Sequence, residues 1–170
     1  MVKYFSLLLF FSLFKIDSCT EMEIQSSVNS NEILGDWIYK NRFLGDAIDT
    51  PCGYAVTNVR ELTLKVEENT ENKEYLKLTG NSAVNMLFAD LKILTFDKAT
   101  GIGTLKIEHL GSTKMAGPPD LMQCEQGYFE MLNDAADFKI ENNKLMIGHF
   151  KKDNTPSRDG GTYMIFEKAK

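Results

Sequence analysis

The sequence predicts an α+β fold in which a curled antiparallel β-sheet, or partial barrel, is plugged by one α-helix. Short segments of alternating apolar and polar residues recur between polar turns along most of the chain, which is typical of antiparallel strands. Residues 119–133 instead repeat their apolar side chains every three or four positions, as a helix does. Because that apolar stripe needs a surface to cover, we expect the helix to close an open end or face of the sheet.

The strands are expected where this alternation is clearest. The segments that share it are 33–39, 61–67, 75–79, 91–96, 102–107, 138–140, 144–147 and 163–167. In the first segment Trp37 is expected to face inward. A polar, acidic turn joins 61–67 to 75–79, so these two predict a hairpin, and a second hairpin is expected to turn at Gly101.

The helix is expected over 119–133. Pro118 and Pro119 fix its entry, and Asp120 is expected to cap it with Gln123 three residues later. Gly127 weakens the helix by about 1 kcal/mol relative to alanine and suggests close packing of backbone at that point. The apolar stripe consists of Leu121, Cys124, Tyr128, Met131 and Leu132.

Residues 1–19 have the three-part layout of a secretory signal peptide. Lys3 precedes an apolar and serine run, residues 5–14, that is too short for a membrane span, and a polar, small-residue segment follows. Cys19 at its end raises the alternative of a lipidated bacterial lipoprotein. Secretion with cleavage near Cys19 and lipid anchoring through Cys19 both lead out of the cytoplasm, to the cell envelope or the medium.

The rest of the chain divides into a polar tether at 20–31 and one domain at 32–170, a size that suits a single core. The formal net charge is -5 and no basic run occurs. This charge excludes nucleic acid as a partner, and it leaves a lipid anchor as the expected link to a membrane. We expect a monomer.

Three motifs resemble the signature of META domains, the HslJ-like family. They are STKMAGPPDLM at 112–122, LTGNSAVN at 78–85 and LGDW at 34–37, in the family's order over about 33–167. Three helix positions add to the match: Glu125, Phe129 and Leu132. The resemblance implies a small secreted or envelope protein, in some bacteria a heat-inducible lipoprotein and in some protozoa a protein linked to motility or virulence. No catalytic activity is established for the family as a class.

The cysteines depart from the family pattern. Members often carry one cysteine in the glycine-asparagine turn and another after the Thr-x-Met-Ala motif, where this chain has Val84 and Gly117. It has Cys52 and Cys124 instead, and in an oxidising compartment two mature cysteines indicate one disulfide. Closing a loop of roughly 73 residues would stabilise the fold by about 4 kcal/mol on the chain-entropy model.

Catalytic, cofactor and metal sites are not expected. A thiol hydrolase would use Cys124 as nucleophile with His109 or His149 as base, but neither histidine lies in a recognisable motif, and a disulfide or an inert buried thiol explains Cys124 better. No Cys-x-x-Cys or His-x-x-x-His spacing occurs, which argues against a zinc site.

Binding is the function that the sequence favours. Thr113, Lys114 and Met115 are expected to line the mouth where the helix enters, either as a contact site or as residues that pack and hydrogen-bond the turn. The polar loop 151–161 has the same two interpretations. We expect a non-catalytic secreted or envelope-anchored domain that acts by binding or protein interaction, with a link to stress or virulence. A carrier of a lipid or other small apolar ligand is the alternative, and a thiol hydrolase is the least favoured function.

Overall fold

The computed structural model describes residues 30–152 and 159–170. The expected leader with Cys19, residues 20–29 of the expected tether and residues 153–158 of the loop 151–161 lie outside these ranges. The described elements are η1 (Ser30–Glu32), β1 (Gly35–Leu44), β2 (Ala47–Asp49), β3 (Thr63–Glu68), β4 (Leu76–Asn81), β5 (Met86–Asp97), β6 (Ile102–Ser112), α1 (Pro119–Asn133), β7 (Asp137–Glu141), β8 (Lys144–Phe150) and β9 (Gly161–Lys168). No helix in the described part of the chain has the length and apolar character needed to cross a bilayer.

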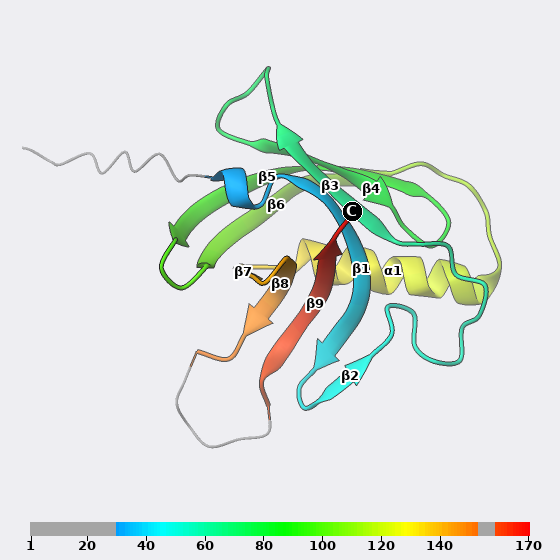
Figure 1. The fold of residues 1–170 in the computed structure, drawn as a ribbon. Coiled ribbons are helices and arrows are strands. Elements are labelled where there is room, and N and C mark those ends of the chain that lie inside the picture. Colours follow the sequence, from blue (N-terminus) through cyan, green and yellow to red (C-terminus); the bar gives the residue numbers. More distant parts are fainter. Residues whose placement is uncertain (1–29, 153–158) are drawn as a thin grey trace, which may run out of the picture.

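The strands form one antiparallel sheet that curls into a ring (Figure 1). Its order is β2-β1-β3-β4-β5-β6-β7-β8-β9, and β1 also pairs with β9, so that the first long strand closes the sheet against the last. The two ends of β1 have different neighbours: residues 35–38 pair with β3, and residues 42–44 pair with β2. Strand β2 is therefore a short addition beside the ring.

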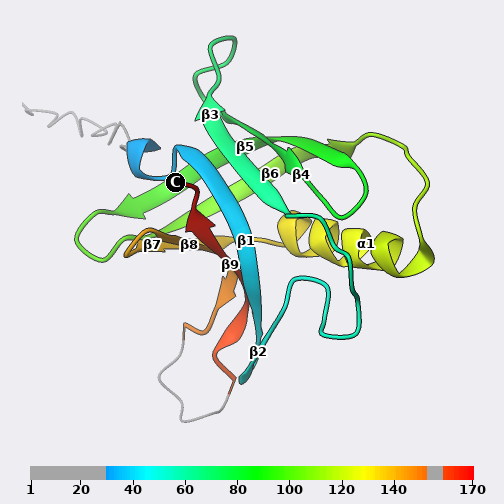
Figure 2. The same cartoon turned by 45° about the vertical axis from the view of Figure 1, so that its right-hand side comes forward.

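Helix α1 lies where the ring is incomplete. Strand β6 pairs with β7 only over Ile102–Thr104, and its remaining residues, up to Ser112, continue past the end of β7. Figures 1 and 2 show α1 running below this part of β6, and the helix contacts both β6 and β8. The helix thereby covers the edge of β6 beyond Thr104, where β7 no longer runs alongside it. The expected fold class, a curled antiparallel sheet plugged by one helix, is confirmed.

The interior of the ring is filled with side chains. Trp37 faces inward as expected, and its indole Nε1 donates a hydrogen bond to the carbonyl oxygen of Ile33 at 2.8 Å. The ring of Tyr39 stacks between those of Tyr128 and Phe166, with centroid distances of 5.2 and 4.9 Å. The largest side chains that are almost fully buried come from both sheet and helix: Trp37, Tyr128, Phe138, Phe166, Ile33, Leu64, Leu78, Leu87, Leu91, Leu132, Leu145 and Ile147.

Both expected hairpins are present, and β5 and β6 are longer than the sequence indicated. Strand β2 was not expected, because three residues carry too little periodicity to be recognised. A third hairpin turns at Asn142 and Asn143, which have φ angles of 51° and 62° and so suit a tight two-residue turn between β7 and β8.

Two expectations about the helix are wrong. Asp120 does not cap it: Pro118 is the residue before the first turn, no side chain caps that turn, and the Asp120 carboxylate accepts a hydrogen bond from the N–H of Leu121 at 3.0 Å. Because proline suits the first helical position, the helix already begins at Pro119, and Asp120 lies inside its first turn. Gly127 does not mark close packing either, because a Cβ atom added there would meet nothing within 4 Å.

Candidate functional site

A buried carboxylate joins the helix to the sheet. Glu125 lies on the inner side of α1 and is only 4% exposed. Its carboxylate accepts hydrogen bonds from the Ser82 hydroxyl, from the backbone N–H groups of Val84 (3.0 Å) and Asn85 (2.6 Å), and from Asn85 Nδ2 (2.7 Å). These donors belong to the turn between β4 and β5, so one side chain fixes the position of that turn against the helix.

The charge of Glu125 is stabilised where it lies. Burial alone would raise the pKa of this carboxyl group, but the hydrogen bonds from Ser82, Asn85 and Val84 together outweigh burial and lower the pKa. Glu125 is therefore ionised at neutral pH. Its two oxygens accept four hydrogen bonds from the β4–β5 turn, so the role of Glu125 is structural: it holds the turn against the helix.

Two further links attach the long segment between β2 and β3 to the same place. The guanidinium of Arg60 donates to the carbonyl oxygens of Ser82 at 2.6 Å and of Asn85 at 2.5 Å. Cys52 and Cys124, the expected pair, are joined in a disulfide with a Cα–Cα distance of 4.9 Å, across 72 positions of sequence. The segment, the turn and the helix thus form one connected unit.

Asn85 also connects this unit to residues 112–118, the segment that leads into α1 and that we call the helix-entry motif. Its Oδ1 accepts hydrogen bonds from the Thr113 hydroxyl at 2.9 Å and from the Met115 N–H at 2.7 Å, while its Nδ2 donates to the Met115 carbonyl oxygen at 3.2 Å. Every polar atom of the Asn85 side chain is therefore used. Thr113 bonds the turn, whereas Lys114 and the side chain of Met115 are exposed.

Three large apolar side chains are exposed in this motif and on the strand that pairs with its first residues. Met86, Phe88 and Met115 are 54%, 52% and 54% exposed, and we call them the apolar patch. Met86 adjoins the motif because the Thr113 N–H donates to its carbonyl oxygen at 3.0 Å and its own N–H donates to the Thr113 hydroxyl at 3.1 Å. Phe88 points to the same outer face, and its ring lies over Gly111, where an added Cβ would be 2.5 Å from Phe88 Cε2.

The two positions where the family often has cysteines lie against each other. A Cβ atom added at Gly117 would be 2.6 Å from Cγ2 of Val84. This contact joins the helix entry to the β4–β5 turn without a covalent bond, and the disulfide of this chain lies elsewhere, between Cys52 and Cys124. A cysteine pair at positions 84 and 117 would therefore lie at a single contact, which explains why this chain lacks both cysteines together.

The residues considered for catalysis are not brought together. The sulfur of Cys124 is bonded to Cys52, so it is no free nucleophile. His109 lies on the exposed face of β6 with its Nδ1 2.9 Å from Asp90 Oδ2. His149 is on β8. Among the described residues, no group of three or more His, Cys, Asp or Glu side chains is placed to hold a metal ion.

The central role of Glu125 was not recognised from the sequence, although a signal was present. Glu125 lies four residues after Leu121 and three before Tyr128, so it falls on the apolar stripe of the helix. A carboxylate at such a position is buried and needs hydrogen-bond donors from another element. What the sequence did not reveal is that the donors come from the glycine-asparagine turn.

Comparison with known proteins agrees with this architecture. The model of the META domain family matches residues 45–169. No significant match to a curated protein was found. Among solved structures, the NMR structure of a protein from Burkholderia xenovorans is similar, with 17% sequence identity and a TM-score of 0.52, over 82% of this chain and 86% of that chain. At this identity the likeness shows the fold alone.

Proposed function

We propose, taking as premise that this chain belongs to the META domain family, that it acts without catalysis and binds a protein partner through the apolar patch. The META domain is not a known enzyme family. The observation that carries the proposal is the exposure of Met86, Phe88 and Met115 at a helix entry that hydrogen bonds of Thr113 and Asn85 hold in place. Large apolar side chains gathered on a surface are typical of protein contact sites.

The way in which the patch is held supports this role. Met115 and Thr113 are fixed by Asn85, which is itself fixed by Glu125. A surface that is ordered before binding loses little conformational entropy when a partner docks. Methionine side chains also adapt to the shape of an apolar partner, because they are unbranched and polarisable.

The filled interior favours a protein-binding role over the carrier alternative. A carrier of a lipid or other apolar ligand needs an apolar space between sheet and helix. In this fold that region is occupied by aromatic and aliphatic side chains, among them Tyr128 of the helix and Phe166 of β9, which stack on Tyr39 between them. Binding at the outer surface requires no rearrangement of these groups.

The proposal places the domain outside the cytoplasm, with a role linked to stress or virulence. The signal-peptide pattern of residues 1–19 and the pairing of Cys52 with Cys124 support export, because disulfides persist in oxidising compartments. The mass of the mature protein from its native host distinguishes the two routes. An acylated chain that begins at Cys19 indicates a lipoprotein, and an unmodified chain that begins near Thr20 indicates secretion.

Site-specific photocrosslinking tests the contact site. A photoreactive phenylalanine analogue is introduced at position 86, 88 or 115 in the native host, and at Ile48 or Leu94 as controls. These two controls are 58% and 50% exposed and lie away from the patch. Discrete crosslinked species at the patch positions and not at the controls are expected. Equal crosslinking at all five positions, or none at the patch, would contradict the proposal.

A further inference from the structure

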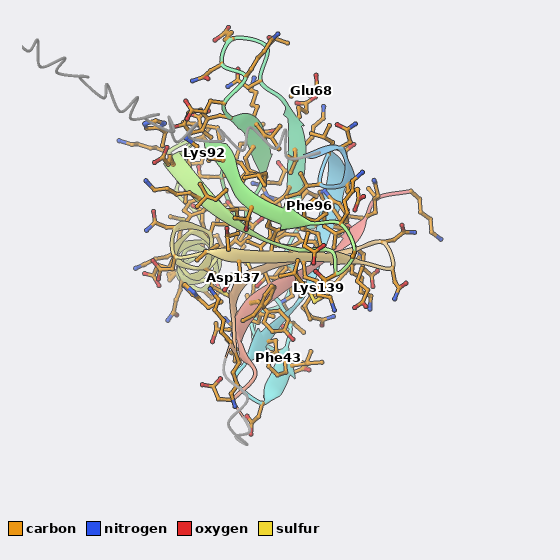
Figure 3. The ribbon with its side chains drawn as sticks, turned by 90° about the vertical axis from the view of Figure 1, so that its left-hand side faces the viewer. Phe43, Glu68, Lys92, Phe96, Asp137 and Lys139 are labelled. Atoms are coloured by element: carbon orange, nitrogen blue, oxygen red, sulfur yellow. A yellow bond between two sulfur atoms is a disulfide. The ribbon has the colours of Figure 1, made fainter. Side chains whose placement is uncertain are left out.

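An acidic hollow adjoins the apolar patch. It lies on the outer face of β3 to β6, between Phe88 and the hairpin that joins β3 to β4. Figure 3 shows Glu68 at the end of the molecule that carries this hairpin, with Phe43 at the opposite end. The side chains that define its charge are Glu67, Glu68, Glu71, Asp90, Lys77 and His109.

Carboxylates outnumber cations in this hollow. Lys77 lines the hollow, and in the register of the sheet it lies opposite Glu67 of β3 and Asp90 of β5. Glu67 also forms an ion pair with Lys65 at 2.6 Å. The exposed carboxylates of Glu68 and Glu71, on the hairpin, add negative charge that these lysines do not balance. The hollow is therefore electrostatically complementary to a cation.

His109 adds a hydrogen-bond acceptor at the rim. It occupies a bulge in β6 with a φ of 53°, a conformation that few residues other than glycine adopt, and its side chain is 77% exposed. Its Nδ1 lies 2.9 Å from Asp90 Oδ2. When Nδ1 carries the proton and donates it to Asp90, Nε2 is left as an acceptor for a donor from outside.

Phe88 connects the hollow to the apolar patch, because it belongs to both. An aromatic face beside several carboxylates suits one side chain in particular. Arginine stacks its planar guanidinium on aromatic rings and donates five hydrogen bonds to carboxylate and imidazole acceptors. Lysine provides the charge without the planar face.

We infer that the acidic hollow receives an arginine from a basic segment of the protein partner, while an adjacent apolar residue of that segment packs on Met86 and Phe88. This inference rests on the proposed function, since it names the chemistry of the partner at the same surface. Because Phe88 borders both the hollow and the patch, the arginine and the apolar residue must lie close together in that segment.

Selection from a library of displayed random peptides tests the inference with the folded, oxidised domain as bait. The charge variant is E68K/E71K, and its matched control is E130K/D134K, which makes the same change of charge at exposed positions of the helix and the residue after it. A third variant, M86S/F88S, removes the apolar contacts. Binding of the selected peptides to all four proteins is then measured by fluorescence anisotropy.

We expect the selected peptides to carry arginine next to an aromatic or aliphatic residue. Their affinity should fall on the order of tenfold in the charge variant, stay near that of the wild type in the control, and fall in the patch variant. Apolar peptides that depend on Met86 and Phe88 and not on the carboxylates would overturn the inference and leave the proposed function intact. Failure to enrich any peptide would overturn the inference too, and absent crosslinks at the patch would separately remove the proposed function.

Discussion

Replacing Glu125 with glutamine removes the negative charge between α1 and the β4–β5 turn and leaves the shape of the side chain almost unchanged. Glutamine has the same shape but offers one acceptor oxygen and one amide group with two donors. The natural carboxylate accepts three hydrogen bonds at Oε2, from Ser82, Val84 and Asn85, and one at Oε1, from Asn85 Nδ2. If the glutamine oxygen takes the place of Oε2, its NH2 group takes the place of Oε1. That NH2 group then faces Asn85 Nδ2, so that two hydrogen-bond donors oppose each other.

The expected cost follows from these contacts. One hydrogen bond to a charged group is lost, and each such bond contributes about 1.5–3 kcal/mol. The three that remain become weaker because their acceptor is neutral. We therefore expect the free energy of unfolding to fall by about 3 kcal/mol at pH 7, and the midpoint of thermal unfolding to fall by roughly 10 °C.

The difference between the two proteins should depend on pH. Because folding lowers the pKa of Glu125, the ionised carboxylate contributes stability that is fully present above the ordinary pKa of a glutamate and is lost as the pH falls through the lower pKa of the folded protein. Glutamine does not titrate. The gap between wild type and E125Q should therefore be widest near neutral pH and should narrow in acid.

Urea unfolding followed by tryptophan fluorescence measures both effects, since Trp37 is buried in the core. Glu130→Gln is the control, because it makes the same change at an exposed position of the same helix, where a difference below about 0.5 kcal/mol is expected. Equal stability of E125Q and wild type at pH 7, or a gap that widens in acid, would refute the role given to this carboxylate.

Three further predictions concern the same unit. Asn85→Asp sets a second carboxylate against Glu125, so we expect a loss of about 2–4 kcal/mol at pH 7 and a smaller loss near pH 4, measured by urea unfolding at both pH values. Replacing both Cys52 and Cys124 with alanine should cost up to about 4 kcal/mol, because the cross-link no longer restricts the unfolded chain; guanidinium unfolding measures this. Gly127→Ala should raise the free energy of unfolding by about 0.5–1 kcal/mol, because alanine favours the helix and its Cβ has open space; thermal unfolding measures this.

Each of these predictions has a control or a contrary result. Gly103→Ala is the control for Gly127→Ala. The added Cβ would collide with the ring of Phe138, so this substitution should destabilise the fold. A loss of stability on Gly127→Ala would show that the glycine is needed for the fold. If Asn85→Asp unfolds like the wild type at pH 7, the close approach of the two side chains is wrong. If the double cysteine variant matches the oxidised wild type, the disulfide does not stabilise the fold.

Local patterns predicted the elements well, because their causes are local. The alternation in residues 61–67 needs only one buried face, and Leu62, Leu64 and Val66 are indeed buried. The helix spans Pro119–Asn133 as expected, since its two prolines and its apolar spacing both lie within the segment. The capping prediction was wrong at the same place, because two local rules competed there and the prolines determined the start.

The candidate site could be predicted only in part, because it depends on contacts between distant residues. Glu125 and Asn85 are 40 positions apart, and their pairing follows from the rotation of the helix about its axis against the β4–β5 turn. Each belongs to a motif visible in the sequence, but nothing in either motif specifies the other as its partner. The exposure of Met86 and Phe88 was equally hidden, since apolar residues in a strand ordinarily predict a buried face.

The closure of the ring by β1 and β9 determines when folding can finish during synthesis. Strand β1 begins at Gly35, and its partner β9 ends at Lys168, so the first and last strands of the ring are far apart in the sequence. Because the chain is made from its N-terminus, the ring cannot close until β9 has been synthesised. Pairing between such distant segments folds slowly. Until that pairing forms, the edge of β1 that faces β9 stays without its partner strand.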